Sequence, residues 1–223
     1  MPNAETNADP DSLRRYTNCP PRHFSRWRFW WYLFVLRFIS NPLLMLTFRP
    51  RVFGRQNVPA IGPFIVVSNH VNAFDPFFVA RAVGYPVAFM AKKELFRYRF
   101  VGEAIRLMGS FALDRDNPSS STLKTAFNVL KSRARWALGM FPEGTRSRTG
   151  SLLPLKKGVG GLAVKTGSPV LPIGIHRGMA GRFIVTVGEV IADDPDPEVV
   201  HTRIHESLLH LVDPGWDRVS KFD

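Results

Sequence analysis

The chain has 223 residues, of which 45% are hydrophobic and 22% are charged. This composition supplies ample apolar material for a core and excludes a wholly disordered chain, while the length fits one α/β domain with an appendage. Because 30 Lys and Arg residues outnumber 18 Asp and Glu residues, the formal net charge of +12 favours an anionic partner such as nucleic acid, an anionic membrane or a phosphorylated substrate.

Residues 1–23 are predicted to form a polar N-terminal tail. The tail begins MPNAETNADPDS, which is acidic and polar, whereas a secretory signal starts with basic residues and continues with an apolar run. We therefore predict no cleaved signal peptide. The single cysteine, Cys19, permits no intramolecular disulfide and fits a reducing compartment.

Residues 24–48 are crowded with aromatic side chains and flanked by arginines, and they are predicted to form a membrane-interacting helical segment. Only Phe29 to Leu36 is uninterrupted, because Arg37 and Pro42 break the apolar run, and a membrane-spanning helix needs roughly 20 largely apolar residues. This favours an interfacial helix, or two short helices bent at Pro42, with tryptophans at headgroup depth and arginines near lipid phosphates. A helix packed on the protein's own core and a single membrane span are the alternatives.

Residues 49–223 are predicted to form an α/β domain. Short apolar runs rich in β-branched residues alternate with helical patterns, which is typical of βαβ units and of a mixed, mostly parallel sheet flanked by helices. The predicted strands are 64–68, 86–91, 110–113, 136–141, 170–175 and 183–190, and the predicted helices are 76–83, 94–108, 120–133, 159–166 and 198–211.

His70 and Asp75 form the first candidate pair of catalytic residues. The strand 64–68 leads into NHVNAFD, so His70 follows the carboxyl end of a strand, where α/β sheets bind ligands. A histidine that takes a proton from an alcohol needs a partner to fix its tautomer and to stabilise the imidazolium, and a nearby carboxylate does both. The alternative is that Asp75, followed by Pro76, serves only as a helix N-cap.

The run FPEGTRSR, residues 141–148, is the second candidate. Pro and Gly open the chain after a strand, so that backbone N–H groups, Thr145 and Arg146 could converge on a phosphate, with Glu143 orienting the guanidinium through an ion pair. An ordinary surface turn with a Glu-Arg pair is the alternative. Lys93 and Arg115, at the ends of two further strands, and the Lys156-Lys157 pair could extend this anion site.

Together, these motifs make the chain resemble the PlsC-type acyltransferases, the 1-acylglycerol-3-phosphate acyltransferase (lysophosphatidic acid acyltransferase) family. The resemblance rests on NHVNAFD, GSFALDR at residues 109–115, FPEGTRSR and VLPIGI at residues 170–175, in that order and with similar spacing. It covers roughly residues 51–191. The first motif has Asn72 where Ser is frequent in the family, a departure that leaves the histidine and aspartate in place.

The resemblance implies an acyltransferase α/β domain on a membrane-binding N-terminal segment, and it implies the role of each motif residue. His70 would be the general base and Asp75 its support, while Glu143, Gly144, Thr145 and Arg146 would bind the phosphate of the acceptor. Arg115 would be a further acceptor contact, and we add Lys93 to this group because of its place at a strand end.

The implied reaction moves an acyl group from an acyl thioester, either acyl-CoA or acyl-ACP (acyl carrier protein with its acyl group), to the sn-2 hydroxyl of lysophosphatidic acid, which gives phosphatidic acid. No cofactor or metal is expected, since His201 and His205 lack a third ligand, and Cys19 has no histidine-bearing context that would make it a nucleophile. We expect a membrane protein, monotopic or single-pass, with its active site facing the cytoplasm, and membrane lipids rather than nucleic acid as partners.

Two other functions are compatible with the sequence. The first is transfer to another lysophospholipid, or from a phospholipid instead of a thioester, since related families also use a histidine and an aspartate in H-x4-D spacing. The second is a non-catalytic basic module that binds membranes or nucleic acid, although such a module would leave the strand-end motifs unexplained.

Overall fold

A seven-stranded sheet forms the centre of the computed structural model, which describes residues 15–60, 62–114, 119–132, 134, 136–178, 181–192 and 194–212. The strand order is β1-β7-β6-β2-β5-β3-β4, and every pairing is parallel except that of β6 with β7. The strands are β1 (Arg51–Phe53), β2 (Ile65–Ser68), β3 (Val87–Lys92), β4 (Phe111–Leu113), β5 (Ala137–Met140), β6 (Val170–Arg177) and β7 (Phe183–Val187). The predicted mixed, mostly parallel sheet is confirmed, and β1 is an additional strand that the sequence did not indicate.

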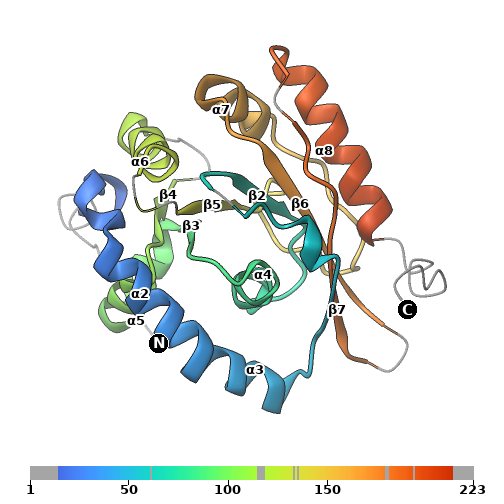
Figure 1. Cartoon of the computed structure of the whole chain (residues 1–223), viewed down its shortest axis with the longest axis horizontal. Helices are drawn as coiled ribbons and strands as arrows, with labels where there is room; N and C mark the ends of the chain where they lie inside the picture. Colours follow the sequence, from blue (N-terminus) through green and yellow to red (C-terminus); the bar gives the residue numbers. More distant parts are fainter. Residues whose placement is uncertain are drawn as a thin grey trace, which may run out of the picture.

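Helices cover both faces of this sheet (Figure 1). One face carries α6 (Ser120–Leu130), α7 (Gly158–Thr166) and α8 (Pro197–Val212), and the other carries α4 (Asp75–Val83). The predicted helix 94–108 is divided at Tyr98 into the 3-10 helix η4 (Lys93–Arg97) and α5 (Arg99–Leu107). All four residues of the central strand β2 are buried, because helices lie on both of its sides.

A helical segment of 22 residues, Arg26–Thr47, crosses the α4 side of the domain (Figure 1). It consists of α2 (Arg26–Val35), the π-helical turn η2 (Leu36–Ser40) and α3 (Asn41–Thr47). Pro42 therefore does not break the segment, because the π-turn just before it takes up the irregularity that a residue without an N–H group imposes. By length and composition alone, this is the one segment among the described residues that could cross a membrane.

The two sides of this segment have different surroundings. Tyr32, Leu36, Ser40 and Leu44 recur every four residues and are buried against the domain. The other side exposes large apolar side chains to solvent, among them Trp27, Trp30, Phe34, Phe38, Leu43 and Leu46. Packing on the core and an exposed apolar face were alternatives at the level of sequence, and the helix has both.

Residues 15–24 pack on the domain although their composition is mostly polar. Tyr16, Cys19 and Phe24 are buried, and the Cys19 backbone N–H donates to Thr125 Oγ1 on α6 at 2.9 Å. Burial raises the pKa of the Cys19 thiol to about 11. The thiol is therefore protonated at neutral pH, which makes it a poor nucleophile.

Candidate active site

Asn69 fixes the chain where it leaves β2. Its side-chain Nδ2 donates to the Ile175 carbonyl at 2.8 Å, and its Oδ1 accepts from the Ile175 N–H at 2.7 Å. The side chain thus pairs with β6 as another strand residue would, and it holds the start of the next loop against the sheet. Sequence reasoning did not single out Asn69, because its partner Ile175 lies 106 residues away in the chain.

His70 and Asp75 are in direct contact, as their spacing predicted. His70 Nδ1 lies 2.7 Å from Asp75 Oδ2, and the Asp75 side chain is fully buried. An ionised carboxylate can only accept hydrogen bonds, so Nδ1 carries the proton and the Nε2 lone pair is available as a base. The His70 ring also stacks on Phe141 with a centroid distance of 4.3 Å and an interplanar angle of 21°, which holds the ring plane.

Asp75 braces the loop that precedes it and is not an N-cap. The same Oδ2 atom accepts the Val71 N–H at 2.6 Å and the Asn72 N–H at 2.8 Å. Helix α4 begins at Asp75 itself, its capping residue is Phe74, and no side-chain capping bond forms. Asn72 supports the same loop, because its Oδ1 accepts the Phe74 N–H at 3.0 Å.

Glu143 joins the two motif loops through its carboxylate. Oε1 accepts the His70 backbone N–H at 2.6 Å, and Oε2 accepts the Leu153 N–H at 2.9 Å. Burial raises the pKa of Glu143, and the two N–H bonds oppose this effect. The suggested ion pair between Glu143 and Arg146 is therefore not formed, because the carboxylate faces backbone donors instead.

The rest of the EGTR turn is held close to His70. Gly144 has φ +71° and donates its N–H to the Phe141 carbonyl at 3.1 Å, and the Ser147 N–H donates to the His70 carbonyl at 2.7 Å. Two of the N–H groups expected to cradle a phosphate are thus used within the protein. Thr145 and Arg146 are exposed, and neither has a hydrogen bond or ion pair with any residue that the structure describes.

The other predicted cations have different surroundings. Lys93 Nζ lies 2.5 Å from Asp114 Oδ2, and this ion pair ties the ends of β3 and β4 together. Lys157 pairs with Glu198 at 3.0 Å on the outer surface. Arg115 lies outside the described residues, so its predicted contact with the acceptor has no structural account.

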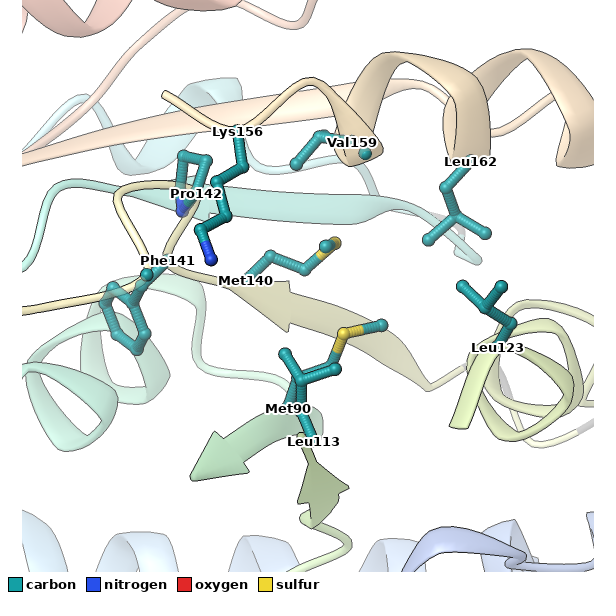
Figure 2. Close-up of a pocket in the computed structure, with 11 residues that line it drawn as sticks. Met90, Leu113, Leu123, Met140, Phe141, Pro142, Lys156, Val159 and Leu162 are labelled. Carbon is teal, nitrogen blue, oxygen red and sulfur yellow. The ribbon is translucent and has the colours of Figure 1, made fainter. Parts of the chain in front are cut away.

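An apolar pocket opens beside these loops, between the sheet and helices α6 and α7 (Figure 2). Lys156 supplies the one charged side chain of the lining, and its nitrogen lies toward the end near Phe141, the residue stacked on His70. Gly144 also lines the pocket, so the EGTR turn forms part of the wall. The apolar lining comes from Met90, Leu113, Leu123, Met140, Val159 and Leu162.

Within the described residues, no group of three His, Cys, Asp or Glu side chains is arranged to hold a metal ion. The groups that the site brings together are a histidine with a carboxylate partner, exposed hydroxyl and guanidinium groups, and an apolar pocket.

Known proteins are similar to this chain in sequence and in fold. Residues 49–176 match the family model described as Acyltransferase. The chain is 31% identical to the 1-acyl-sn-glycerol-3-phosphate acyltransferase of Bacillus subtilis, over 85% of this chain and 97% of that protein. A chloroplastic 1-acyl-sn-glycerol-3-phosphate acyltransferase of Brassica napus is also 31% identical, over 85% of this chain and 55% of that protein. The crystal structure of the acyltransferase PlsC from Thermotoga maritima matches with a TM-score of 0.67 and 28% identity, and the match covers 85% of this chain and 81% of that one.

Proposed function

Because the chain belongs to the Acyltransferase family, we propose that it moves a fatty acyl group from an acyl thioester to the sn-2 hydroxyl of lysophosphatidic acid, which gives phosphatidic acid. The observation that carries this proposal is the buried contact between His70 and Asp75 at the carboxyl edge of the sheet. The thioester donor is acyl-CoA or acyl-ACP, in which the acyl group is bound to acyl carrier protein.

The reaction needs one proton transfer in each direction. His70 Nε2 takes the proton of the sn-2 hydroxyl as its oxygen attacks the thioester carbonyl, and Asp75 stabilises the imidazolium that forms. The tetrahedral intermediate collapses with cleavage of the carbon–sulfur bond, and the imidazolium returns the proton to the departing thiolate. His70 ends in its starting state, and no acyl-enzyme is formed.

The substrates have distinct places in this proposal. The acceptor phosphate binds Thr145 and Arg146, whose side chains are exposed and have no partner among the described residues. Arg115 keeps its proposed role as a further contact. Lys93 would have to leave Asp114 to reach a phosphate, so we give it the role of holding the β3 and β4 ends. The fatty acyl chain occupies the apolar pocket.

Replacing Arg146 by alanine is expected to raise the KM for lysophosphatidic acid by about 10- to 100-fold, with a smaller effect on kcat, because a charge-assisted bond to phosphate contributes on the order of 1.5–3 kcal/mol. Steady-state kinetics at a saturating thioester concentration measure this change. Arg148→Ala removes an exposed arginine of the same loop and serves as the matched control. An unchanged acceptor KM in Arg146→Ala would remove Arg146 from the phosphate site.

Glu143 is proposed to position His70 rather than to bind phosphate, and Gly144 to shape the turn. Glu143→Gln keeps one acceptor oxygen but turns an amide N–H₂ toward the second backbone donor, which leaves a buried N–H unpaired. We expect a loss of about 1–3 kcal/mol in the free energy of unfolding and a lower kcat, with the acceptor KM little changed. Chemical denaturation and kinetics measure both, with the exposed Glu189→Gln as control. A raised KM at normal kcat would favour direct phosphate binding instead.

The exposed apolar side of the Arg26–Thr47 segment is proposed to lie in the membrane interface, with the active site on the cytoplasmic side. The buried stripe from Tyr32 to Leu44 keeps the segment on the domain, which favours a monotopic arrangement over a single span. Point substitutions on the exposed side test this better than a deletion, because removing residues 1–48 would also take Phe24, Tyr32, Leu36 and Leu44 out of the core.

Assays with purified protein test the proposed function. The protein is incubated with lysophosphatidic acid and either acyl-CoA or acyl-ACP, the thioester of acyl carrier protein, and phosphatidic acid and free thiol are measured together. Equal amounts of the two products are expected. Transfer from a phospholipid without any thioester, or a clear preference for an acceptor without the phosphomonoester, would contradict the proposal.

A further inference from the structure

A second exposed apolar surface lies on η4 and the start of α5. Phe100 is 90% exposed and Tyr98 is 68% exposed, although large aromatic residues in a soluble domain are usually well covered. We define the α5 surface by its exposed residues, which are Leu95, Arg97, Tyr98, Arg99, Phe100 and Val101. Single exposed apolar residues are normal, but a contiguous group of them indicates an interaction surface.

The charges around the α5 surface are predominantly positive. Arg97 and Arg99 alternate with the aromatic residues, and neither forms an ion pair with a residue that the structure describes. The neighbouring acidic groups form ion pairs with other cations. The Glu103 carboxylate lies 3.2 Å from the Arg15 guanidinium and 3.4 Å from that of Arg106, and the Glu94 carboxylate lies 3.6 Å from the Lys92 ammonium group. The surface thus combines aromatic rings with arginines that have no ion-pair partner in the described part of the chain, and this is the composition of a segment that binds an anionic bilayer interface.

Helix α5 is packed closely against the segment that precedes it. Gly102 packs against the Phe96 backbone so closely that an added Cβ would lie 3.0 Å from the Phe96 Cα atom. Phe96 is itself buried. Tyr98, the capping residue of α5, and Phe100, in its first turn, therefore lie on a segment that is fixed to the domain, and binding to a partner would not require this segment to fold first.

The position of the α5 surface joins it to both the membrane-facing helix and the active site. Arg28 of α2 donates from Nη2 to the Arg106 carbonyl of α5 at 2.9 Å, and the two helices lie close together in Figure 1. Strands β2, β5 and β3 all run parallel, so their carboxyl ends lie at the same edge of the sheet. His70 follows β2 and η4 follows β3, and both therefore leave the sheet at this edge.

We propose that the α5 surface is a second membrane contact, which inserts Tyr98 and Phe100 into an anionic phospholipid interface while Arg97 and Arg99 bind lipid phosphates. The inference rests on the proposed function, because an enzyme that acylates a lipid must bring its active site to the bilayer. Two contacts on adjacent helices fix the tilt of the domain and turn the carboxyl edge of the sheet toward the lipid.

Vesicle binding of the full-length protein tests the apolar part of the α5 surface. We expect Tyr98→Ser with Phe100→Ser to lower binding to vesicles of phosphatidylglycerol and phosphatidylcholine by about 10-fold or more. Leu209→Ser is the matched control, because this exposed leucine belongs to α8, and α8 and α5 lie at opposite ends of the view in Figure 1. Binding equal to that of the unsubstituted protein would overturn the inference, provided that circular dichroism shows a folded variant.

Vesicles of different charge test the arginines of the α5 surface independently of the aromatic variant. Arg97→Gln with Arg99→Gln is expected to weaken binding to the anionic vesicles by about 30-fold, because each arginine near an anionic surface contributes about 1 kcal/mol, and to leave binding to pure phosphatidylcholine vesicles unchanged. An equal loss on both kinds of vesicle, or none on either, would contradict a contact with anionic lipid.

Two further measurements distinguish a membrane contact from a protein interface and from an active-site defect. Concentration-dependent self-association that disappears in the Tyr98/Phe100 variant would overturn the inference in favour of a second copy of the chain. Turnover of detergent-dispersed substrate should stay normal in all these variants, since none of the substituted residues belongs to the active site. If the protein failed to acylate lysophosphatidic acid but the variants still lost vesicle binding, the proposed function would fall and the membrane contact would remain.

Discussion

His70→Ala is expected to lower kcat for transfer from acyl-CoA to lysophosphatidic acid by about 10³- to 10⁴-fold, while vesicle binding stays unchanged. The imidazole is the one group in contact with Asp75 that can take a proton from the acceptor hydroxyl, and its Nδ1 is already occupied by that carboxylate. Alanine leaves the thioester and the acceptor in place but removes the base. The acceptor KM should therefore change far less than kcat.

The fold should tolerate this substitution. The bonds that hold the loop, from the His70 N–H to Glu143 and from the Ser147 N–H to the His70 carbonyl, are made by the backbone of residue 70 and persist in alanine. The loss is confined to the imidazole, including its stacking on Phe141. His201→Ala on α8 is the control for histidine removal away from the site. Normal turnover in His70→Ala would exclude His70 as the base.

The parallel centre of the sheet could be predicted, because the sequences of its strands are compatible with few other environments. A run such as Ile65–Ser68 is short, apolar and rich in β-branched residues, and it stays buried on both faces only between two layers of helices. Strand β1 could not be predicted, because its three residues Arg51–Phe53 carry no such pattern and pair with β7 by tertiary contact. The division of the predicted helix 94–108 at Tyr98 brings Gly102 against the Phe96 backbone, and this tertiary contact leaves no pattern in the sequence.

The N-terminal helix illustrates a second limit. Its aromatic residues lie on all sides, so composition indicated apolar contacts without assigning each side a partner. The four-residue spacing of Tyr32, Leu36, Ser40 and Leu44 identifies the core-facing stripe once the domain is present. The burial of Cys19 could not be predicted either, because the backbone of Cys19 is bonded to Thr125 and Asn128 of α6, which lie 106 and 109 residues away in the chain.

Within the site, the contact between His70 and Asp75 could be predicted from the sequence, because the two residues are only five positions apart in one loop. The role of Glu143 was not, because both of its partners are backbone N–H groups, and one of them belongs to a loop 73 residues away. Asn69 shows the same limit, since its side chain pairs with Ile175 at a separation of 106 residues. Residue type indicates which side chains can accept a hydrogen bond, and only tertiary structure decides which donors reach them.

Asp75→Asn is expected to lower kcat by about 10²- to 10⁴-fold with little change in stability. Asp75 Oδ2 accepts all three bonds, from His70, Val71 and Asn72, whereas Oδ1 has no hydrogen-bond partner in the described structure. The asparagine carbonyl can replace Oδ2 and its amide can replace Oδ1, so the loop keeps its acceptor. The variant thus removes the negative charge that stabilises the imidazolium, and stopped-flow measurement of thiol release reports the loss.

Asp75→Ala is compared with Asp75→Asn to distinguish the effect of the negative charge from the effect of the loop hydrogen bonds. Unlike asparagine, alanine also removes the acceptor of the Val71 and Asn72 N–H groups. We expect it to lose a similar factor in kcat and, in addition, about 1–3 kcal/mol in the free energy of unfolding. If Asp75→Asn kept full turnover while Asp75→Ala lost both stability and turnover, the carboxylate would act only by shaping the loop. If both variants lose turnover and only alanine loses stability, the buried charge itself drives the proton transfer at His70.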